Sequence, residues 1–76
     1  MSNYDLVLEV IESYEDGNIL NDFLNEFESG KDVSKKDFIG FCNRFIDDMS
    51  ESYYINLNWK YIKSGGDESV FDEING

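Results

Sequence analysis

Hydrophobic residues recur at helical spacing near the start of the chain. Within residues 3–15 they fall at positions i, i+3, i+4 and i+7, as Val7, Val10, Ile11 and Tyr14. This spacing is typical of an amphipathic helix with one buried face. Ser2 or Asn3 can cap the start of this helix, and Gly17 is expected to end it.

A second helix is predicted over residues 18–28, with Gly30 as its stop. Its hydrophobic stripe consists of Leu20, Phe23, Leu24 and Phe27. The connection across residues 16–17 is short, so the two helices are expected to form an antiparallel hairpin.

A third helix has the clearest start signal in the chain. Ser34-Lys35-Lys36-Asp37 resembles a capping box in which Asp replaces the usual Glu or Gln. A helical stripe then continues through Phe38, Phe41, Cys42, Phe45, Ile46 and Met49. Gly40 lies inside this helix, where glycine costs about 1 kcal/mol relative to alanine, and it would permit close packing of a neighbouring helix.

Residues 52–63 have an ambiguous pattern. Hydrophobic and polar residues alternate over 53–61, as in a strand, yet Tyr54, Leu57 and Tyr61 also share one helical face. We favour a helix, because a partner strand at 69–74 would be short and a lone hairpin is marginal. The predicted fold is mainly α, a bundle of three to four short helices in one domain, 1–76. An α+β fold with a C-terminal strand or hairpin around 53–74 is the alternative.

Charge is segregated along the chain. The net charge of −11 divides into −8 over residues 1–30, +1 over 31–63 and −4 over 64–76. The first segment contains eight carboxylates and neither Lys nor Arg. Mixed charges would be enough for solubility, so this segregation favours a surface shaped by an electropositive partner.

Most catalytic chemistry lacks its residues here. The chain has no His, and its single cysteine, Cys42, lies on the hydrophobic stripe of the third helix, where a buried and inert thiol is expected. No phosphate-binding glycine motif or calcium-loop spacing occurs. We therefore expect a protein that is not an enzyme and has no catalytic residues, metal site or cofactor. Without a signal peptide or an apolar stretch long enough to cross a bilayer, a cytoplasmic location is expected.

The carboxylates of the first helix form a row. Asp5, Glu9, Glu12 and Asp16 follow at steps of four, three and four, and Asp22 and Glu26 repeat this spacing on the second helix, with no Lys or Arg nearby in sequence. Such rows can occupy a basic groove that otherwise holds nucleic-acid phosphates. Tyr53, Tyr54, Trp59 and Tyr61 are candidate aromatic anchors. The predicted partner-binding residues are Asp5, Glu9, Glu12, Glu15, Asp16, Asp22, Glu26, Tyr53, Tyr54 and Trp59.

Each of these features also has a simpler interpretation. An acidic helix face is usually a solvated surface, and clustered aromatic residues usually belong to a core.

In size, net charge and carboxylate layout, the chain resembles the small acidic nucleic-acid mimics of phages and mobile elements, the anti-CRISPR and anti-restriction inhibitors. The resemblance implies a viral, stoichiometric inhibitor in the host cytoplasm. It would block the basic groove of a target such as a CRISPR effector or restriction enzyme, without binding nucleic acid or membrane itself. The chain resembles, less closely, the acidic immunity proteins that neutralise nuclease toxins. A non-inhibitory adaptor or transcription-regulating partner is a further alternative.

Overall fold

The fold consists of short helices joined by tight connections. The computed structural model describes residues 2–45 and 52–72. Over these ranges the chain forms four α-helices and a 3₁₀ helix: α1 (Tyr4–Glu12), α2 (Gly17–Glu26), α3 (Lys35–Asn43), α4 (Ser52–Lys63) and η1 (Glu68–Phe71). No strand occurs in them, so the predicted mainly helical bundle is confirmed. The helix favoured over 52–63 is confirmed too, and η1 lies where the alternative fold needed a partner strand.

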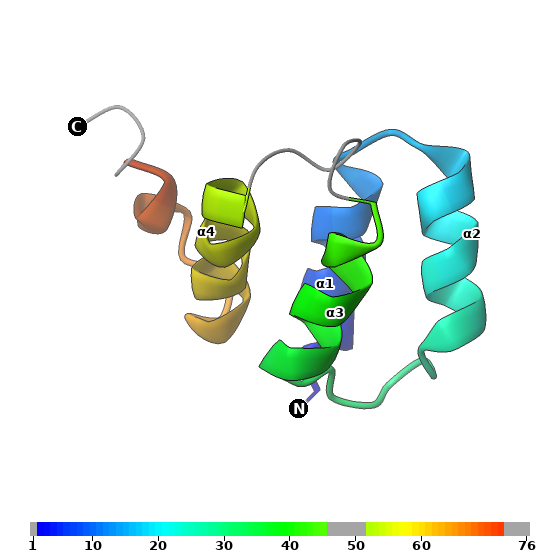
Figure 1. Ribbon diagram of the computed structural model, residues 1–76. Coiled ribbons are helices and arrows are strands. Elements are labelled where there is room, and N and C mark those ends of the chain that lie inside the picture. The colour runs from blue at the N-terminus through cyan, green and yellow to red at the C-terminus, as the bar shows by residue number, and fades with distance from the viewer. Residues whose placement is uncertain (1, 46–51, 73–76) are drawn as a thin grey trace.

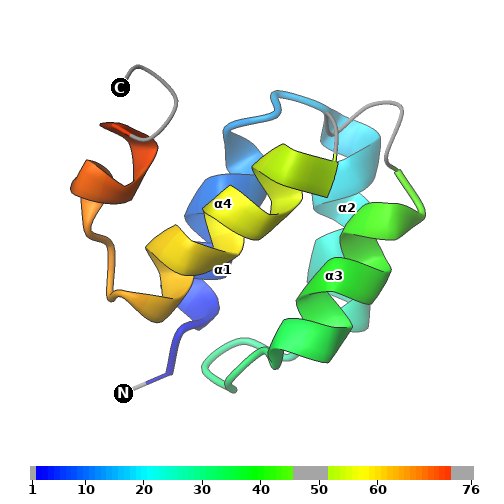
Figure 2. The same ribbon diagram turned by 60° about the vertical axis from the view of Figure 1, so that its left-hand side comes forward.

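Successive helices run in opposite directions. Figure 1 shows α1 and α3 rising while α2 and α4 descend, which confirms the predicted α1–α2 hairpin. Helix α4 packs on both α3 and α1, and η1 packs on α4. In Figures 1 and 2, α2 and α4 lie on opposite sides of the pair formed by α1 and α3. The outer surfaces of α2 and α4 therefore lie on opposite sides of the molecule.

Side-chain caps begin two of the described α-helices, and Asp67 caps η1. Ser34 Oγ accepts a hydrogen bond from the Asp37 backbone N–H at 3.1 Å, so the predicted start of α3 is confirmed. Helix α2 is capped in the same way by Asp16. The prediction that Asn3 caps α1 is wrong, because its side chain bonds elsewhere. Its amide group donates to the Val33 carbonyl at 2.8 Å and accepts from the Val33 N–H at 2.7 Å, which ties the start of α1 to the connection before α3.

The α1–α2 connection differs from the prediction. Helix α1 ends at Glu12 rather than at residue 15, and Gly17 is the first residue of α2 rather than a stop. The chain turns at Glu15, whose φ of 54° lies in the left-handed region. Helix α2 ends at Glu26, two residues earlier than predicted. Gly17 was predicted to end α1, but an Asp-Gly pair can also start a helix. Here Asp16 caps α2 and Gly17 is its first residue.

The core is built mainly from the predicted hydrophobic stripes. Phe23 is at its centre, with ring centroids 5.4 Å from Tyr4, 5.0 Å from Phe27 and 5.9 Å from Phe41. Other buried side chains come from each of the four helices and include Val7, Ile11, Ile19, Phe38, Cys42, Ile55 and Ile62. Ile46 and Met49, predicted to extend the stripe of α3, lie outside the described residues.

Gly40 does not have its predicted role. Among the described residues, none comes within 4 Å of a Cβ atom built at this glycine, so no described part of the chain packs closely against it. The residue is exposed on the outer side of α3.

Candidate partner-binding surface

The outer face of α1 is acidic, as predicted. Tyr4, Val7, Val10 and Ile11 form the buried face of this helix, and Asp5, Glu9 and Glu12 are exposed. The fourth member of the predicted row, Asp16, leaves the row because α1 ends at Glu12. Its carboxylate instead accepts hydrogen bonds from the Asn18 and Ile19 N–H groups, at 2.9 and 3.3 Å. Asp16 is therefore committed to starting α2.

Two acids of the first thirty residues are neutralised by ion pairs. Arg44, the residue after α3, forms an ion pair with Glu26 of α2, and Lys31 pairs with Glu28, three positions before it, at 3.3 Å. Glu26 has no basic residue nearby in sequence, but the fold brings Arg44 to it from eighteen positions away. The four remaining acids of this region are exposed, and no Lys or Arg in the described ranges forms an ion pair with them: Asp5, Glu12, Glu15 and Asp22.

Glu9 is bound to the core through Tyr61. The Tyr61 hydroxyl donates a hydrogen bond to Glu9 Oε1 at 2.8 Å, and the tyrosine itself is only 6% exposed. This bond to a carboxylate, together with burial and the nearby charges of Glu9 and Glu68, raises the pKa of Tyr61 above its usual value. Glu9 was predicted to be a partner-binding residue of the acidic row. In the structure it links α1 to α4.

The predicted aromatic anchors separate into two groups. Tyr53 and Tyr54 are 53% and 39% exposed and form an edge-to-face pair with centroids 5.5 Å apart. Trp59 is half-buried, with its ring 5.5 Å from Phe38, and Tyr61 belongs to the core. The two exposed tyrosines belong to α4, whereas Asp22 and Glu26 belong to α2, and these two helices lie on opposite sides of the α1–α3 pair (Figure 1). The predicted residues therefore do not form one patch.

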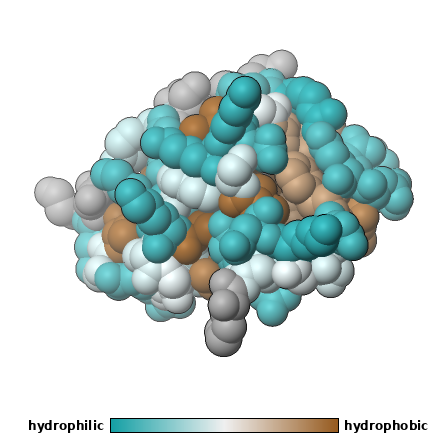
Figure 3. Space-filling model, turned by 90° about the horizontal axis from the view of Figure 1, so that it is seen from below, coloured by the Kyte–Doolittle hydropathy of each residue, from teal (hydrophilic) through white to brown (hydrophobic). Residues whose placement is uncertain are grey.

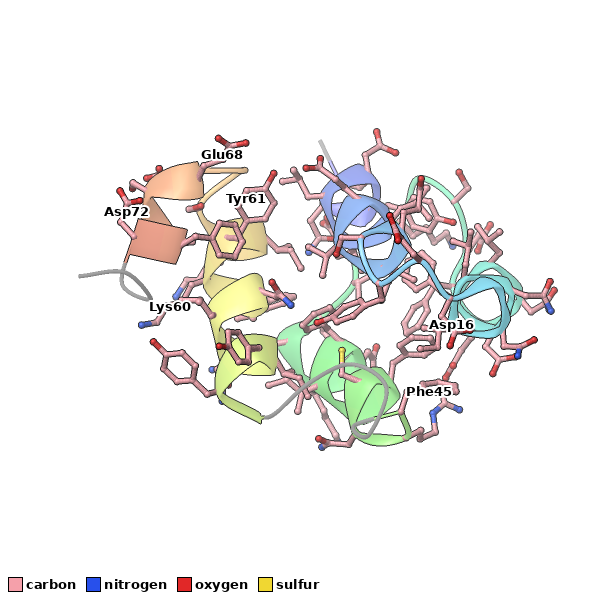
Figure 4. The ribbon with its side chains drawn as sticks, turned by 90° about the horizontal axis from the view of Figure 1, so that it is seen from above. Asp16, Phe45, Lys60, Tyr61, Glu68 and Asp72 are labelled. Atoms are coloured by element: carbon pink, nitrogen blue, oxygen red, sulfur yellow. The ribbon has the colours of Figure 1, made fainter. Side chains whose placement is uncertain are left out.

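An acidic groove between α1, α4 and η1 contains two acids that were absent from the predicted site. The groove has a volume of about 430 Å³. The residues that line it include three acids, Glu9, Glu68 and Asp72, together with Ser13, Asn58 and Phe71. Figure 4 shows Tyr61 reaching from α4 toward this space, with Glu68 on neighbouring η1. The run of acids after Gly66 was the only sequence signal for this groove.

The groove lining can accept hydrogen bonds from a cationic side chain, but it does not form a metal site. In the described part of the chain, no three His, Cys, Asp or Glu side chains are grouped closely enough to hold a metal ion. Cys42 offers no reactive thiolate either, because it is buried and burial raises its pKa to about 12.

Figure 3 shows one face of the molecule, where hydrophilic side chains cover most of the area and hydrophobic ones appear between them. Among the described helices, none is both long and apolar enough to span a bilayer. No protein-family model, curated protein or solved structure matches this chain.

Proposed function

We propose that this protein is a stoichiometric inhibitor that occupies the basic, nucleic-acid-binding groove of a target protein. A CRISPR effector or a restriction enzyme is the kind of target that fits. One observation carries the proposal: exposed acids follow one another along α1, the connection and α2, and no described Lys or Arg pairs with them. They are Asp5, Glu12, Glu15 and Asp22.

Electrostatics explains why such a surface would bind a groove made for nucleic acid. DNA presents one negative charge per roughly 1.7 Å of helix axis, and its binding proteins meet it with rows of Lys and Arg. Exposed carboxylates can bind the same cations and exclude the duplex. The repulsion among the acids of the free protein is relieved when the partner's cations approach. The net charge of −11 also favours rapid association with a positively charged target.

The first experiment identifies the target and asks whether the protein competes with nucleic acid. The immobilised protein captures binding partners from a lysate of the host cell, and the captured protein is then titrated with duplex DNA or RNA. We expect nucleic acid and this protein to displace one another. We also expect the affinity to fall when NaCl rises from about 0.05 M to about 0.3 M, mainly through slower association.

Two matched charge reversals test the acidic surface itself. Glu12→Lys changes an acid that has no described ion-pair partner, whereas Glu28→Lys makes the same change at an acid already neutralised by Lys31. We expect Glu12→Lys to weaken target binding by about tenfold or more, and Glu28→Lys to have a much smaller effect.

Three results would contradict the proposal. The captured partner could bind no nucleic acid, the duplex and this protein could bind the partner simultaneously, or the two variants could bind equally well. An adaptor role would then explain the acidic surface better. Capture of a nuclease toxin, blocked at its nucleic-acid groove, would identify the protein as an immunity protein.

A further inference from the structure

Helix α2 contains more hydrophobic side chains than the core of the chain uses. Ile19 and Phe23 form its buried face. Leu20 and Leu24 lie four positions apart, so they form a second hydrophobic ridge beside that face. Leu20 is half-buried, and Leu24 is 51% exposed. Among the described residues, Leu24 is the only exposed large aliphatic side chain, and the other exposed large hydrophobic residues are two tyrosines of α4.

This ridge is turned away from α3. Glu26 pairs with Arg44, the residue after α3, so the side of α2 that includes Glu26 faces α3. Leu24 lies two positions before Glu26, and residues two positions apart are about 200° apart around a helix axis. Leu24 therefore lies on the outer side of the α1–α2 hairpin.

Helix α1 supplies a leucine and two acids to the same side. Val10, at one edge of its buried face, lines the acidic groove that α1 shares with α4 and η1. Leu8 lies at the other edge, beside the exposed acids Asp5 and Glu12, which are three and four positions away. Because α2 and α4 lie on opposite sides of the α1–α3 pair, this other edge is the one next to α2 (Figures 1 and 2). The apolar strip between the two helices, which we call the leucine seam, consists of Leu8, Leu20 and Leu24.

We propose that the leucine seam is the hydrophobic centre of the target-binding surface, and that it docks an apolar side chain of the target that has Lys or Arg on either side. The assignment rests on the proposed function, because it takes the occupant to be the same target. Charge complementarity specifies this occupant. Asp5 and Glu12 lie along the α1 edge of the seam and have no described ion-pair partner, so the surface that covers the seam has to bring cations with it. An apolar centre inside a polar rim is the usual layout of a protein interface.

The position of the seam also decides between the candidate hydrophobic anchors. Tyr53 and Tyr54 are exposed too, but they belong to α4, on the opposite side of the α1–α3 pair from α2 (Figure 1). A target that covers the acids of α1 and α2 covers Leu24 and leaves the two tyrosines outside the contact. Burial of Leu24 adds affinity that salt does not screen, because the hydrophobic effect does not depend on charge.

A pair of peptides tests the seam without the target. Acetyl-Arg-Leu-Arg amide offers a leucine between two guanidinium groups, and acetyl-Arg-Gly-Arg amide keeps the charges but lacks the apolar side chain. Each peptide is titrated into the isotope-labelled full chain, and the backbone amide shifts are followed by NMR. We expect the leucine peptide to bind about threefold or more tightly, with its shift changes centred on residues 5–12 and 20–25. Equal affinities, or shift changes centred on α4, would overturn the proposal.

Two alanine substitutions form a matched pair for the target itself. Leu24→Ala and Tyr53→Ala each remove a side chain that is about half exposed, 51% and 53%, but only Leu24 lies in the leucine seam. Both variants should fold, because alanine is the better helix former, and circular dichroism checks this. With the purified partner from the capture experiment, we expect Leu24→Ala to weaken binding by about tenfold, mainly through faster dissociation. The loss should be equal at about 0.05 M and about 0.3 M NaCl, whereas Tyr53→Ala should bind within about twofold of the unmodified protein.

The role of the seam and the proposed function fail in different ways. If Glu12→Lys weakens target binding and Leu24→Ala does not, the acidic surface binds the target and only the role of Leu24 is overturned. If neither variant changes binding, the proposed function fails as well. Loss of binding in Tyr53→Ala but not in Leu24→Ala would overturn the seam and place the hydrophobic contact on α4.

Discussion

Replacing Glu9 with alanine should destabilise the fold, whereas the same change at Glu12 should not. Both residues are exposed acids on α1, and both substitutions replace the same side chain. Only Glu9 accepts the hydrogen bond from the Tyr61 hydroxyl, at 2.8 Å. The pair therefore isolates one contact between α1 and α4 from the general effect of removing a negative charge.

The expected magnitude follows from the surroundings of that bond. Hydrogen bonds to charged groups contribute about 1.5–3 kcal/mol, and a buried hydroxyl without a partner is costly. Tyr61 is 6% exposed, but its bond to Glu9 borders the open acidic groove, where water can take the place of the carboxylate. We therefore expect Glu9→Ala to lower the free energy of unfolding by about 1–1.5 kcal/mol. This loss corresponds to a melting temperature about 4–8 °C lower for a domain of this size.

Urea unfolding followed by circular dichroism measures the effect, and a double-mutant cycle with Tyr61→Phe assigns it. If the bond is the cause, Glu9→Ala should cost little in the Tyr61→Phe background. Glu12→Ala should stay within about 0.5 kcal/mol of the unmodified protein, since it also removes repulsion from neighbouring acids. Equal stabilities for Glu9→Ala and Glu12→Ala, with no coupling to Tyr61, would refute this reasoning.

Three further predictions concern single side chains. Asp16→Ala should lower the free energy of unfolding by about 1 kcal/mol with an unchanged urea m-value, because α2 loses its N-terminal cap. Trp59→Ala should lower the free energy of unfolding by about 2 kcal/mol in the same urea assay, because Trp59 packs on Phe38 and is half-buried. Unchanged stability together with lost target binding would instead identify Trp59 as a binding anchor. Burial raises the pKa of Cys42 from 9.0 to about 12, so the fold favours the neutral thiol. The stability that the neutral Cys42 thiol contributes is complete below pH 9 and is lost as the pH rises toward about 12. Melting temperatures measured from about pH 8 to about pH 11 should therefore fall. In Cys42→Val this fall should begin at a higher pH.

The sequence alone was sufficient for the helices and for most of the core. Helical periodicity identifies the buried faces of α1 and α3, because one face of each helix must be hydrophobic to pack. The predicted stripe of α2 is only partly right: Phe23 is buried, but Leu24 is 51% exposed and the buried Ile19 lay outside the stripe. Ser34 is recognisable as a cap because its hydroxyl acts within the next three residues, a range that sequence reading covers. The charge segregation is also a property of the sequence, and it remains the basis of the proposed function. Over residues 53–61 the hydrophobic pattern fits both a helix and a strand, so periodicity alone does not distinguish them. A helix is favoured there because a partner strand at 69–74 would be too short.

Only the tertiary structure decided what the individual acids do. In the sequence, three carboxylates of the predicted rows look equivalent: Glu9, Asp16 and Glu26. In the structure Glu9 accepts a hydrogen bond from Tyr61, Asp16 caps α2, and Glu26 pairs with Arg44. Two of these three contacts join residues that are eighteen or more positions apart, as does the pairing of Asn3 with Val33. Spacing along one helix contains no information about partners on another helix. Whether Gly40 meets a neighbour likewise depends on where the other helices pack, and in this chain they leave it open to the outside.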